Sequence, residues 1–599
     1  MPRRALPLIG VCLSLALVTA VLPRPEAASA QTVPDESTAT GVVFEDRDAD
    51  GMHDVDEPGV PGVSVSNGLD VVRTDPEGRY RLGVTDETNI FITKPPGYMV
   101  PVDDEQLPQF YYTHYPNGSP VETRYPGIEP TGPLPESVDF PLVAQEESDT
   151  FEAVVFADPQ TRSFDELEDF RTDVVDELVG TDATFGMTVG DIVNDPLDLF
   201  EPHNEIVSAI GIPWWNLPGN HDINYDVPDD TYSTQTYQRV YGPTDYSVEY
   251  GQVHFVNMDN VDYFGEEDGG YRGYLDERQL EWLANDLAHV PADKLIMIAT
   301  HIPLRTEAIG GAALSTVNLD ELFEVLDGRE HLFSVSGHDT SNSWQMYLEP
   351  GELRTPPPGV NPAVWDGPEA FHHQVLAEVR GSGWNTGPLD DRGVQAADMS
   401  DGNPNGYYFV RFDGNEHTPR FQPASLPDDF QMRITFQGGA GNRVLSDGTP
   451  VWIPSGPSGS DGISPSPQFD RRDWVPRFGP APLVEVNVFD GGSRHAVEAR
   501  FDDGDFAPMD YDPPVFGLTG ADPDGNLDPY IRALREGLTG SERPASPQPS
   551  SHLWTAAVPR GLRPGAHTVT IRSTDPYGQV SESSQAFEVT SGRPAQPRR

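Results

Sequence analysis

Leu217-Pro218-Gly219-Asn220-His221-Asp222 is the most informative stretch of the sequence. It follows the apolar run Ile212-Pro213-Trp214-Trp215 and leads into a polar loop, as a buried strand does when it ends at a functional site. Asn220 offers a neutral oxygen ligand, and His221 beside Asp222 offers an oriented acid or a metal ligand. Polar residues after a strand also form ordinary turns, so this motif needs support from the rest of the chain.

Strands and helices alternate around this motif, which is typical of an α/β domain. Ala157-Asp158-Pro159-Gln160, Gly190-Asp191, Thr300-His301 and Gly337-His338-Asp339 each follow a predicted strand. In open α/β sheets ligands bind at this edge, so the motifs predict one composite site. The predicted strands are 151–157, 183–189, 212–217, 295–299 and 332–335, with a hairpin over 246–258 and helices over 163–178, 197–210, 275–287 and 319–326.

The side chains at these strand ends combine hard oxygen with imidazole. This combination suits two divalent ions such as zinc, manganese or iron, about 3.5–4 Å apart and bridged by a carboxylate. His221, backed by Asp222, is the candidate acid that protonates a leaving oxygen. The alternative is that each polar residue only caps its strand. The candidate ligands are Asp158, Asp191, Asn220, His301 and His338.

The ordered series Asp158, Gly190-Asp191, Gly219-Asn220-His221-Asp222, His301 and Gly337-His338 resembles the calcineurin-like metallophosphoesterases. The resemblance implies a four-layer αββα sandwich that hydrolyses a phosphate ester. It also implies that Asp191 bridges two metals, that Asp158 binds the first, and that Asn220, His301 and His338 bind the second. His221 would be the catalytic histidine.

The series departs from the family pattern at two positions. Gln160 replaces the histidine of an Asp-x-His motif, and Thr340 replaces the second histidine of a Gly-His-x-His motif. Both missing imidazoles would serve the first metal, to which Gln160 can offer only an amide oxygen. Asp339 would substitute only if its loop shifts. The second metal site is therefore predicted to be complete and the first weakened.

Short predicted strands over 38–146 indicate a small antiparallel sandwich in the N-terminal part. An acidic loop lies between two of these strands. Its oxygen spacing, with glycine at the sixth place and glutamate at the twelfth, fits a calcium loop. The flanks are strands, so it is not an EF-hand, and an acidic solvated turn is the alternative. The calcium candidates are Asp46, Asp48, Asp50, Asp54 and Glu57.

The first 30 residues resemble a secretory signal, with Arg3 and Arg4, an uncharged run over 5–22, and the cleavage pattern Ala28-Ser29-Ala30. An uncleaved membrane anchor is the alternative, and no second membrane span is predicted. Cys12, the only cysteine, lies in this segment, so the mature chain has no disulfide. We expect a secreted or extracytoplasmic monomer.

The composition argues against a nucleic-acid partner. The chain has 38 Lys plus Arg residues against 96 Asp plus Glu residues, and Lys94 and Lys294 are the only lysines. Such a surface repels nucleic acids and anionic membranes.

Four segments are expected: a signal over 1–30, the N-terminal sandwich, a phosphoesterase domain over 149–365, and a C-terminal β-rich domain over 366–590. The C-terminal motifs Phe371-His372-His373, Gly381-Ser382-Gly383-Trp384 and residues 401–407 resemble those of a bacterial subgroup with flanking β-rich domains. His372 and His373 either approach the metals or pack in the core. The last predicted hairpin turns at Asp575-Pro576-Tyr577-Gly578, as in an immunoglobulin-like sandwich.

Two functions are consistent with these residues. The first is a secreted metal-dependent phosphoesterase acting on a phosphate-ester substrate. The second is a surface binding protein whose phosphoesterase core has lost activity, for which Gln160 and Thr340 are the evidence.

Overall fold

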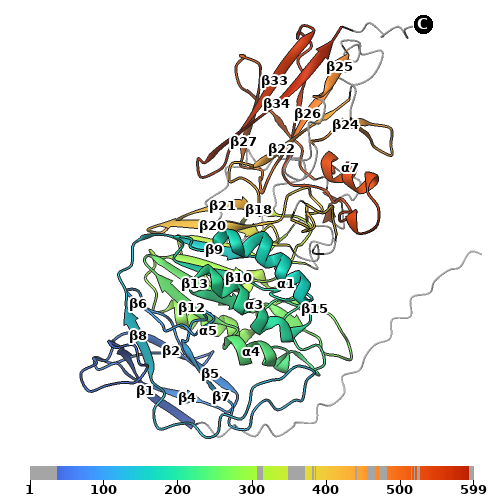
Figure 1. The fold of residues 1–599 in the computed structure, drawn as a ribbon. Helices are drawn as coiled ribbons and strands as arrows, with labels where there is room; N and C mark the ends of the chain where they lie inside the picture. The colour runs from blue at the N-terminus through green and yellow to red at the C-terminus, as the bar shows by residue number, and fades with distance from the viewer. Residues whose placement is uncertain are drawn as a thin grey trace, which may run out of the picture.

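The computed structural model describes residues 37–591 except 307–313, 349–370, 381–383, 385, 391, 439–441, 455–465, 471–481, 515, 518–519 and 522–525. The predicted signal over 1–30 and the motif residues 381–383 lie outside the described residues. Figure 1 shows β-strands of the N-terminal part at one end of the molecule, an α/β unit in the middle, and C-terminal strands at the other end.

The N-terminal unit consists of two four-stranded sheets, in the orders β4-β1-β8-β6 and β3-β2-β5-β7. Alternate residues of β1 and β4 are buried, so the first of these sheets has one face on the core, as the alternation in the sequence predicts. The strands are β1 Ser37–Glu45, β2 Ser64–Ser66, β3 Val71–Arg73, β4 Arg79–Val84, β5 Thr88–Ile92, β6 Tyr98–Met99, β7 Tyr111–His114 and β8 Phe140–Ala144.

A buried ionic cluster joins this unit to the α/β unit. The Lys94 ammonium is fully buried, pairs with Glu147, donates to the Glu249 carbonyl at 2.8 Å, and lies 3.6 Å from the centre of the Tyr250 ring. The Lys294 ammonium lies 3.0 Å from a Glu249 carboxylate oxygen. Both lysines of the chain therefore contact Glu249 at this junction.

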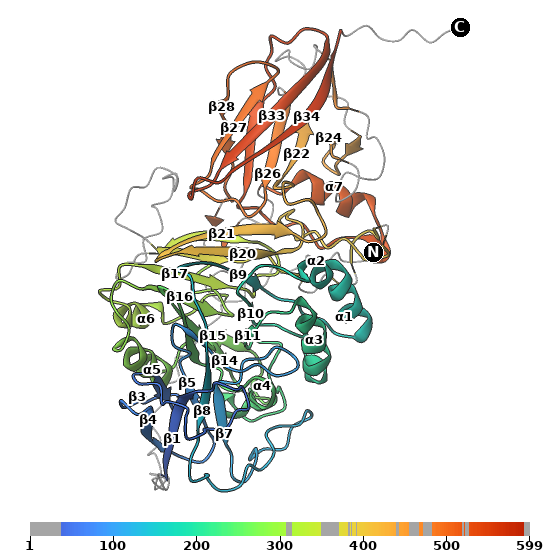
Figure 2. The ribbon, with the colours of Figure 1, turned by 60° about the vertical axis from the view of Figure 1, so that its left-hand side comes forward.

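The α/β unit has the predicted four layers. One sheet has the order β11-β10-β9-β20-β21, and the facing sheet has the order β12-β13-β16-β17-β19-β18. Figure 2 shows α5 and α6 on one side of the sheets and α1, α2 and α3 on the other. The strands are β9 Thr150–Phe156, β10 Phe185–Val189, β11 Trp214–Leu217, β12 Tyr246–Tyr250, β13 Val253–Met258, β16 Leu295–Thr300, β17 Leu332–Ser336, β18 Trp344–Leu348, β19 Phe371–Val375, β20 Gly406–Asp413 and β21 Glu416–Pro423, with the side hairpin β14 Val261–Tyr263 and β15 Tyr271–Gly273.

Helix boundaries follow local signals in the sequence. Ser163 caps α1 as predicted, because its side chain accepts a hydrogen bond from the Glu166 amide, and Asp276 and Gln279 form a capping box on α5. Of the described helices, none is long and apolar enough to cross a membrane. The α-helices of this unit are α1 Phe164–Phe170, α2 Asp176–Leu178, α3 Phe200–Val207, α4 Gln235–Tyr241, α5 Glu277–Leu287 and α6 Leu319–Val325, with a π-helical turn at Arg171–Val175 and 3-10 turns at Leu197–Leu199, Ser208–Ile210 and Asp230–Tyr232.

The two central sheets continue past residue 366, where we expected the C-terminal domain to begin. β19 pairs in parallel with β17, and β20 pairs antiparallel with β9, so residues up to Pro423 complete the two central sheets. Hydrophobic patterning predicts that these segments are strands, but it does not show with which sheet each strand pairs. The C-terminal sandwich begins only at β22.

The C-terminal unit packs a sheet of order β23-β24-β22-β26-β32-β29 on one of order β25-β34-β33-β27-β28. The predicted last hairpin is confirmed, since Thr574 pairs with Val580 across the turn. The strands are β22 Met432–Gln437, β23 Arg443–Val444, β24 Pro450–Trp452, β25 Gln468–Asp470, β26 Leu483–Val488, β27 Ala496–Phe501, β28 Ala507–Pro508, β29 Asp510–Tyr511, β30 Phe516–Gly517, β31 Gly520–Ala521, β32 Leu553–Ala557, β33 Gly565–Thr574 and β34 Val580–Thr590, with α7 Pro529–Gly537 and a 3-10 turn at Gly540–Glu542.

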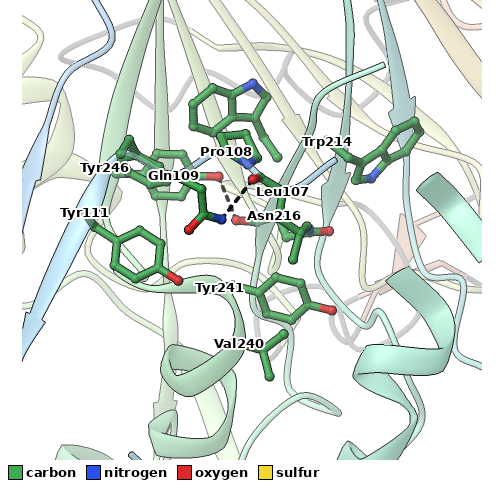
Figure 3. A pocket seen from close by; sticks show the side chains of 11 residues that line it. Leu107, Pro108, Gln109, Tyr111, Trp214, Asn216, Val240, Tyr241 and Tyr246 are labelled. Atoms are coloured by element: carbon green, nitrogen blue, oxygen red, sulfur yellow. Dashed lines mark hydrogen bonds between the residues drawn. The ribbon is translucent and has the colours of Figure 1, made fainter. Parts of the chain in front are cut away.

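A small cavity lies where the N-terminal segment 107–111 meets β11 and α4. Figure 3 shows Gln109 and Tyr111 beside Asn216, Tyr241 and Tyr246, with the Tyr246 hydroxyl donating to the Asn216 carbonyl at 2.7 Å. The cavity volume is about 10 Å³, which is room for one water molecule. This space between the two units is too small to bind a substrate.

Candidate metal centre

Five loops meet at the carboxyl ends of the central strands. Asp158, Asp191 and Asn220 follow β9, β10 and β11 of one sheet, while His301 and His338 follow β16 and β17 of the facing sheet. The three strands of the first set run parallel, as do the two of the second. The ligand atoms of Asp191, His301 and His338 consequently lie within 4.8 Å of one another.

Four side chains converge on what we call the second position: Asp191, Asn220, His301 and His338. The His301 Nε2 atom lies 3.2 Å from Asp191 Oδ1, 3.1 Å from Asn220 Oδ1 and 3.3 Å from His338 Nδ1. His301 Nδ1 lies 3.0 Å from the Val189 carbonyl, a contact that leaves Nε2 as the ring atom that would face a metal ion. Two imidazoles, a carboxylate and an amide oxygen thus suit a divalent transition ion.

The backbone at the site adopts conformations that side chains other than glycine rarely occupy. Asp158, Gln160, Asp191 and His338 have φ angles of 52°, 45°, 51° and 70°. Each such residue costs about 1–3 kcal/mol and persists only where its surroundings enforce it, and this strain is common at functional sites. Hydrogen bonds between the loops enforce it here, including His338 N–H to Asp158 Oδ2 at 2.9 Å and Gln160 N–H to the Asp191 carbonyl at 2.9 Å.

Two glycines allow the carboxylates to approach the neighbouring backbone. A Cβ atom at Gly219 would lie 2.3 Å from Asp191 Oδ1, and one at Gly337 would lie 2.3 Å from Asp158 Oδ2. Both distances are far below van der Waals contact. The loops at this edge therefore leave no space for a side chain at either position.

The two buried carboxylates have opposite pKa shifts. Burial raises the pKa of Asp158, and the nearby Asp191 carboxylate raises it further, although the His301 ring acts against both. Burial also disfavours the charged form of Asp191, but the His301 and His221 rings outweigh it and lower the pKa of that carboxyl. Asp191 is thus the more readily ionised of the pair, which suits a bridging ligand.

His221 lies at the edge of the centre with its side chain 29% exposed. Its amide donates to Asp191 Oδ1 at 2.8 Å, and its ring Nδ1 lies 2.7 Å from Asp195 Oδ1. Burial lowers the pKa of His221, but the Asp191 and Asp195 carboxylates outweigh it and raise that pKa to about 9. The ring is accordingly oriented by Asp195, with Nε2 free to hold a proton toward a substrate.

The ring partner that we predicted, Asp222, lies elsewhere. Its side chain is fully buried and accepts three backbone N–H groups, from Ile192 at 3.0 Å, Val193 at 3.1 Å and Gly219 at 2.8 Å. Asp222 therefore holds the two loops together and does not contact the His221 ring through a hydrogen bond. Asp195 was missed because it is four residues after Asp191 in a loop whose course the sequence does not reveal.

The first position, formed by Asp158, Gln160, Asp191 and Thr340, does not fit a metal in the same way. Gln160 Nε2 lies 2.6 Å from Asp191 Oδ2 and 3.4 Å from Asp158 Oδ1, so the amide presents N–H donors to the carboxylates. Asp339 cannot compensate, because its Oδ2 accepts from the Trp344 indole at 2.9 Å.

His372 and His373 belong to β19 and have packing partners. His372 Nδ1 lies 2.5 Å from the Tyr577 hydroxyl, and His373 Nδ1 lies 2.8 Å from the Ser334 hydroxyl. Burial lowers the pKa of His373 to about 3. These contacts place both residues in the core, His372 at the junction with the C-terminal unit.

The N-terminal loop brings together three of its five calcium candidates. Carboxylate oxygens of Asp46, Asp48 and Asp50 lie within 4.8 Å of one another. Glu57 closes the loop instead, since its carboxylate accepts from the Arg47 amide at 2.7 Å and the Asp54 amide at 3.0 Å. The side chain of Asp54 is exposed and is not part of this cluster.

Two family models match parts of the chain. Residues 47–126 match the family described as the N terminal of calcineurin-like phosphoesterase, and residues 378–580 match the C terminal of calcineurin-like phosphoesterase. A solved structure of purple acid phosphatase PPD1 from seeds of yellow lupin (Lupinus luteus) matches 65% of this chain and 67% of its own, with 11% identity and a TM-score of 0.33. No curated protein matches the chain.

The two family matches lie on either side of the strand ends that carry Asp158, Asp191, Asn220, His301 and His338, although the C-terminal match also includes β20 and β21 of the α/β unit. Residues 47–126 and 378–580 thus match the N-terminal and C-terminal parts of calcineurin-like phosphoesterases, on either side of a four-layer unit that carries the predicted ligand set.

Proposed function

We propose that the chain is an exported hydrolase that cleaves a phosphate ester at a centre holding a divalent ion in the second position. The observation that carries this proposal is the convergence of Asp191, Asn220 and His338 on the Nε2 atom of His301 within 3.3 Å. When bound, such an ion withdraws negative charge from a phosphoryl oxygen.

His221 supplies the acid in this proposal. Its Nδ1 faces Asp195, so the proton for the leaving oxygen is held at Nε2, on the partly exposed side of the ring. Asp195 fixes the tautomer and the ring orientation, and Asp191 supports the backbone amide of the same residue. Asp158, whose pKa is raised by burial, lies buried at the first position.

Turnover of a bis-aryl phosphate and of an aryl phosphate, each with added Mn²⁺, tests the function. We expect His221→Ala to retain the metal content of the parent protein and to lose about 100-fold or more in turnover, as for other positioned acids. His289→Ala, an exposed histidine just beyond α5, is the matched control and should keep full activity.

No hydrolysis of either ester by the metal-loaded parent would instead favour the second function, a binding protein with an inactive core. The replacement of two family histidines by Gln160 and Thr340 is the observation in favour of that alternative. The ratio of the two turnover numbers assigns the enzyme to monoesters or diesters.

We further propose a second, weakly held ion at the first position, calcium in the N-terminal loop, export through the signal over 1–30, and a monomeric state. The shared Asp191 and the buried Asp158 support weak binding at the first position. The clustered oxygens of Asp46, Asp48 and Asp50 support calcium.

A further inference from the structure

The Gln160 amide occupies the space between the two buried carboxylates. Its Nε2 lies 2.6 Å from Asp191 Oδ2 and 3.4 Å from Asp158 Oδ1, and the side chain is 4% exposed. The lone pair of an amide nitrogen is delocalised into the carbonyl group and does not bind a metal, and the two hydrogens on this nitrogen carry partial positive charge. The amide thus stands where a cation would otherwise face Asp158 and Asp191.

Asn194 fixes the orientation of this amide. Its Nδ2 donates to Gln160 Oε1 at 3.1 Å, so turning the amide oxygen toward the carboxylates would break this bond and bring Nε2 against another donor. The two loops are joined by Gln160 N–H to the Asp191 carbonyl at 2.9 Å and Asn194 N–H to the Thr161 carbonyl at 3.0 Å. These backbone hydrogen bonds therefore fix the positions of the residues whose side chains contact the amide.

The rest of the first position offers little to outweigh this arrangement. Thr340 has an un-ionised hydroxyl where the family has an imidazole, and the Asp339 carboxylate is committed to Trp344. The second position, by contrast, has two imidazoles, Asn220 and the bridging carboxylate in place.

We propose that Gln160, held by Asn194, closes the first position, so that the folded enzyme keeps one divalent ion per chain. A second ion enters only when the amide turns and releases Asn194. Gln160 and Asn194 are positioning residues in this scheme, since they determine how many ions the centre holds. The inference rests on the proposed function only for the location of the metal centre.

The direction of one mutational effect tests the proposal. If Asn194 holds the amide in its blocking orientation, Asn194→Ala should tighten binding of the second Mn²⁺ by a factor of about 3 to 10, the effect of one lost hydrogen bond. If Asn194 instead orients the Gln160 oxygen as a metal ligand, the same substitution should weaken binding of the second Mn²⁺. Asn415→Ala is the control, because it also removes a side-chain amide hydrogen bond. That exposed bond joins Asn415 Nδ2 to the Asp293 carbonyl at 3.0 Å and lies far along the chain from Asn194.

Metal content after dialysis and calorimetric titration with Mn²⁺ provide the measurements, on the full chain. We expect one retained equivalent for the parent and for Asn415→Ala. Gln160→Glu, which replaces the donor nitrogen with an oxygen, should retain about two. Two retained equivalents in the parent, or weaker second-ion binding in Asn194→Ala, would overturn the proposal.

These outcomes are independent of the proposed function. A parent protein that hydrolyses phosphate esters while retaining two ions would refute the role of Gln160 and leave the phosphoesterase assignment intact. A parent that retains one ion and has no turnover would support the role of Gln160 and refute the phosphoesterase assignment. Melting curves of each variant establish that the folded chain is being titrated.

Discussion

Asp222→Asn separates a structural role from a catalytic one at the residue that follows His221. In the structure Asp222 Oδ2 accepts from Ile192 and Gly219, and Oδ1 accepts from Val193. Asparagine has one acceptor oxygen, so two of these bonds persist with a neutral acceptor and the third N–H faces another donor. The connection that Asp222 makes between the two loops therefore loses one hydrogen bond, and the other two become weaker.

The magnitude follows from these contacts. Losing a hydrogen bond to a charged acceptor costs about 1.5–3 kcal/mol, and weakening two more adds to this. Burial raises the pKa of Asp222 to about 7, because a charged carboxylate is unfavourable at this position. The neutral asparagine avoids that penalty, which offsets part of the lost hydrogen bonding. We expect a net loss of roughly 2–3 kcal/mol, which lowers the melting temperature of the α/β unit by roughly 5–10 °C.

Turnover, unlike stability, should be little affected by Asp222→Asn. Measured per metal-loaded folded molecule at pH 8, Asp222→Asn should reduce turnover by less than about 3-fold, because Asp222 does not bond to the His221 ring. Asp195→Asn should leave the melting temperature unchanged and reduce turnover about 10-fold, since this exposed carboxylate orients the ring. An unchanged melting temperature with a large loss of turnover in Asp222→Asn would refute this division of roles.

Three further outcomes are expected. Calcium should raise the melting temperature of the full chain, and replacing Asp46 and Glu57 with alanine should abolish that shift; no shift in the parent would mean the loop is only acidic. Asp286→Asn should destabilise the protein by about 2–3 kcal/mol at pH 6 and much less above pH 9. Burial lowers the pKa of His254, but Asp286, together with Glu249, outweighs it and raises that pKa to about 9. The stabilisation is therefore full below pH 6.5 and is lost as the pH rises through 9. Gly219→Ala places a Cβ atom 2.3 Å from the bridging carboxylate, so elemental analysis should show loss of metal, whereas full metal content would mean that the loop can accommodate the added methyl group.

Much of the central fold and of the site was predictable from local sequence. A buried strand that ends in polar residues needs only its own apolar run to be recognised, and Asp158, Asp191, Asn220, His301 and His338 all follow such runs. Parallel pairing then brings the strand ends to one edge. The Ser163 cap of α1 depends on contacts within one helical turn and was predicted for the same reason.

Features that depend on contacts between distant segments were not predictable. Whether Asp222 or Asp195 faces the His221 ring depends on how two loops fold over each other, and adjacency in the sequence favours the wrong residue. The pairing of β20 with β9 joins residues more than 240 positions apart, so patterning could not show that the central sheets continue past residue 366. The orientation of the Gln160 amide is set by Asn194, which no spacing rule relates to it.

The burial of Lys94 and Lys294 has a consequence for the chemistry of the folded surface. Both lysine ammonium groups are held against Glu249 at the junction of the first two units, and the two residues have exposed fractions of 0% and 7%. Every other side-chain cation is an arginine or a histidine. Amine-acylating reagents should therefore label the native protein only at its terminus, and the rate at which lysine becomes labelled would time the opening of that junction.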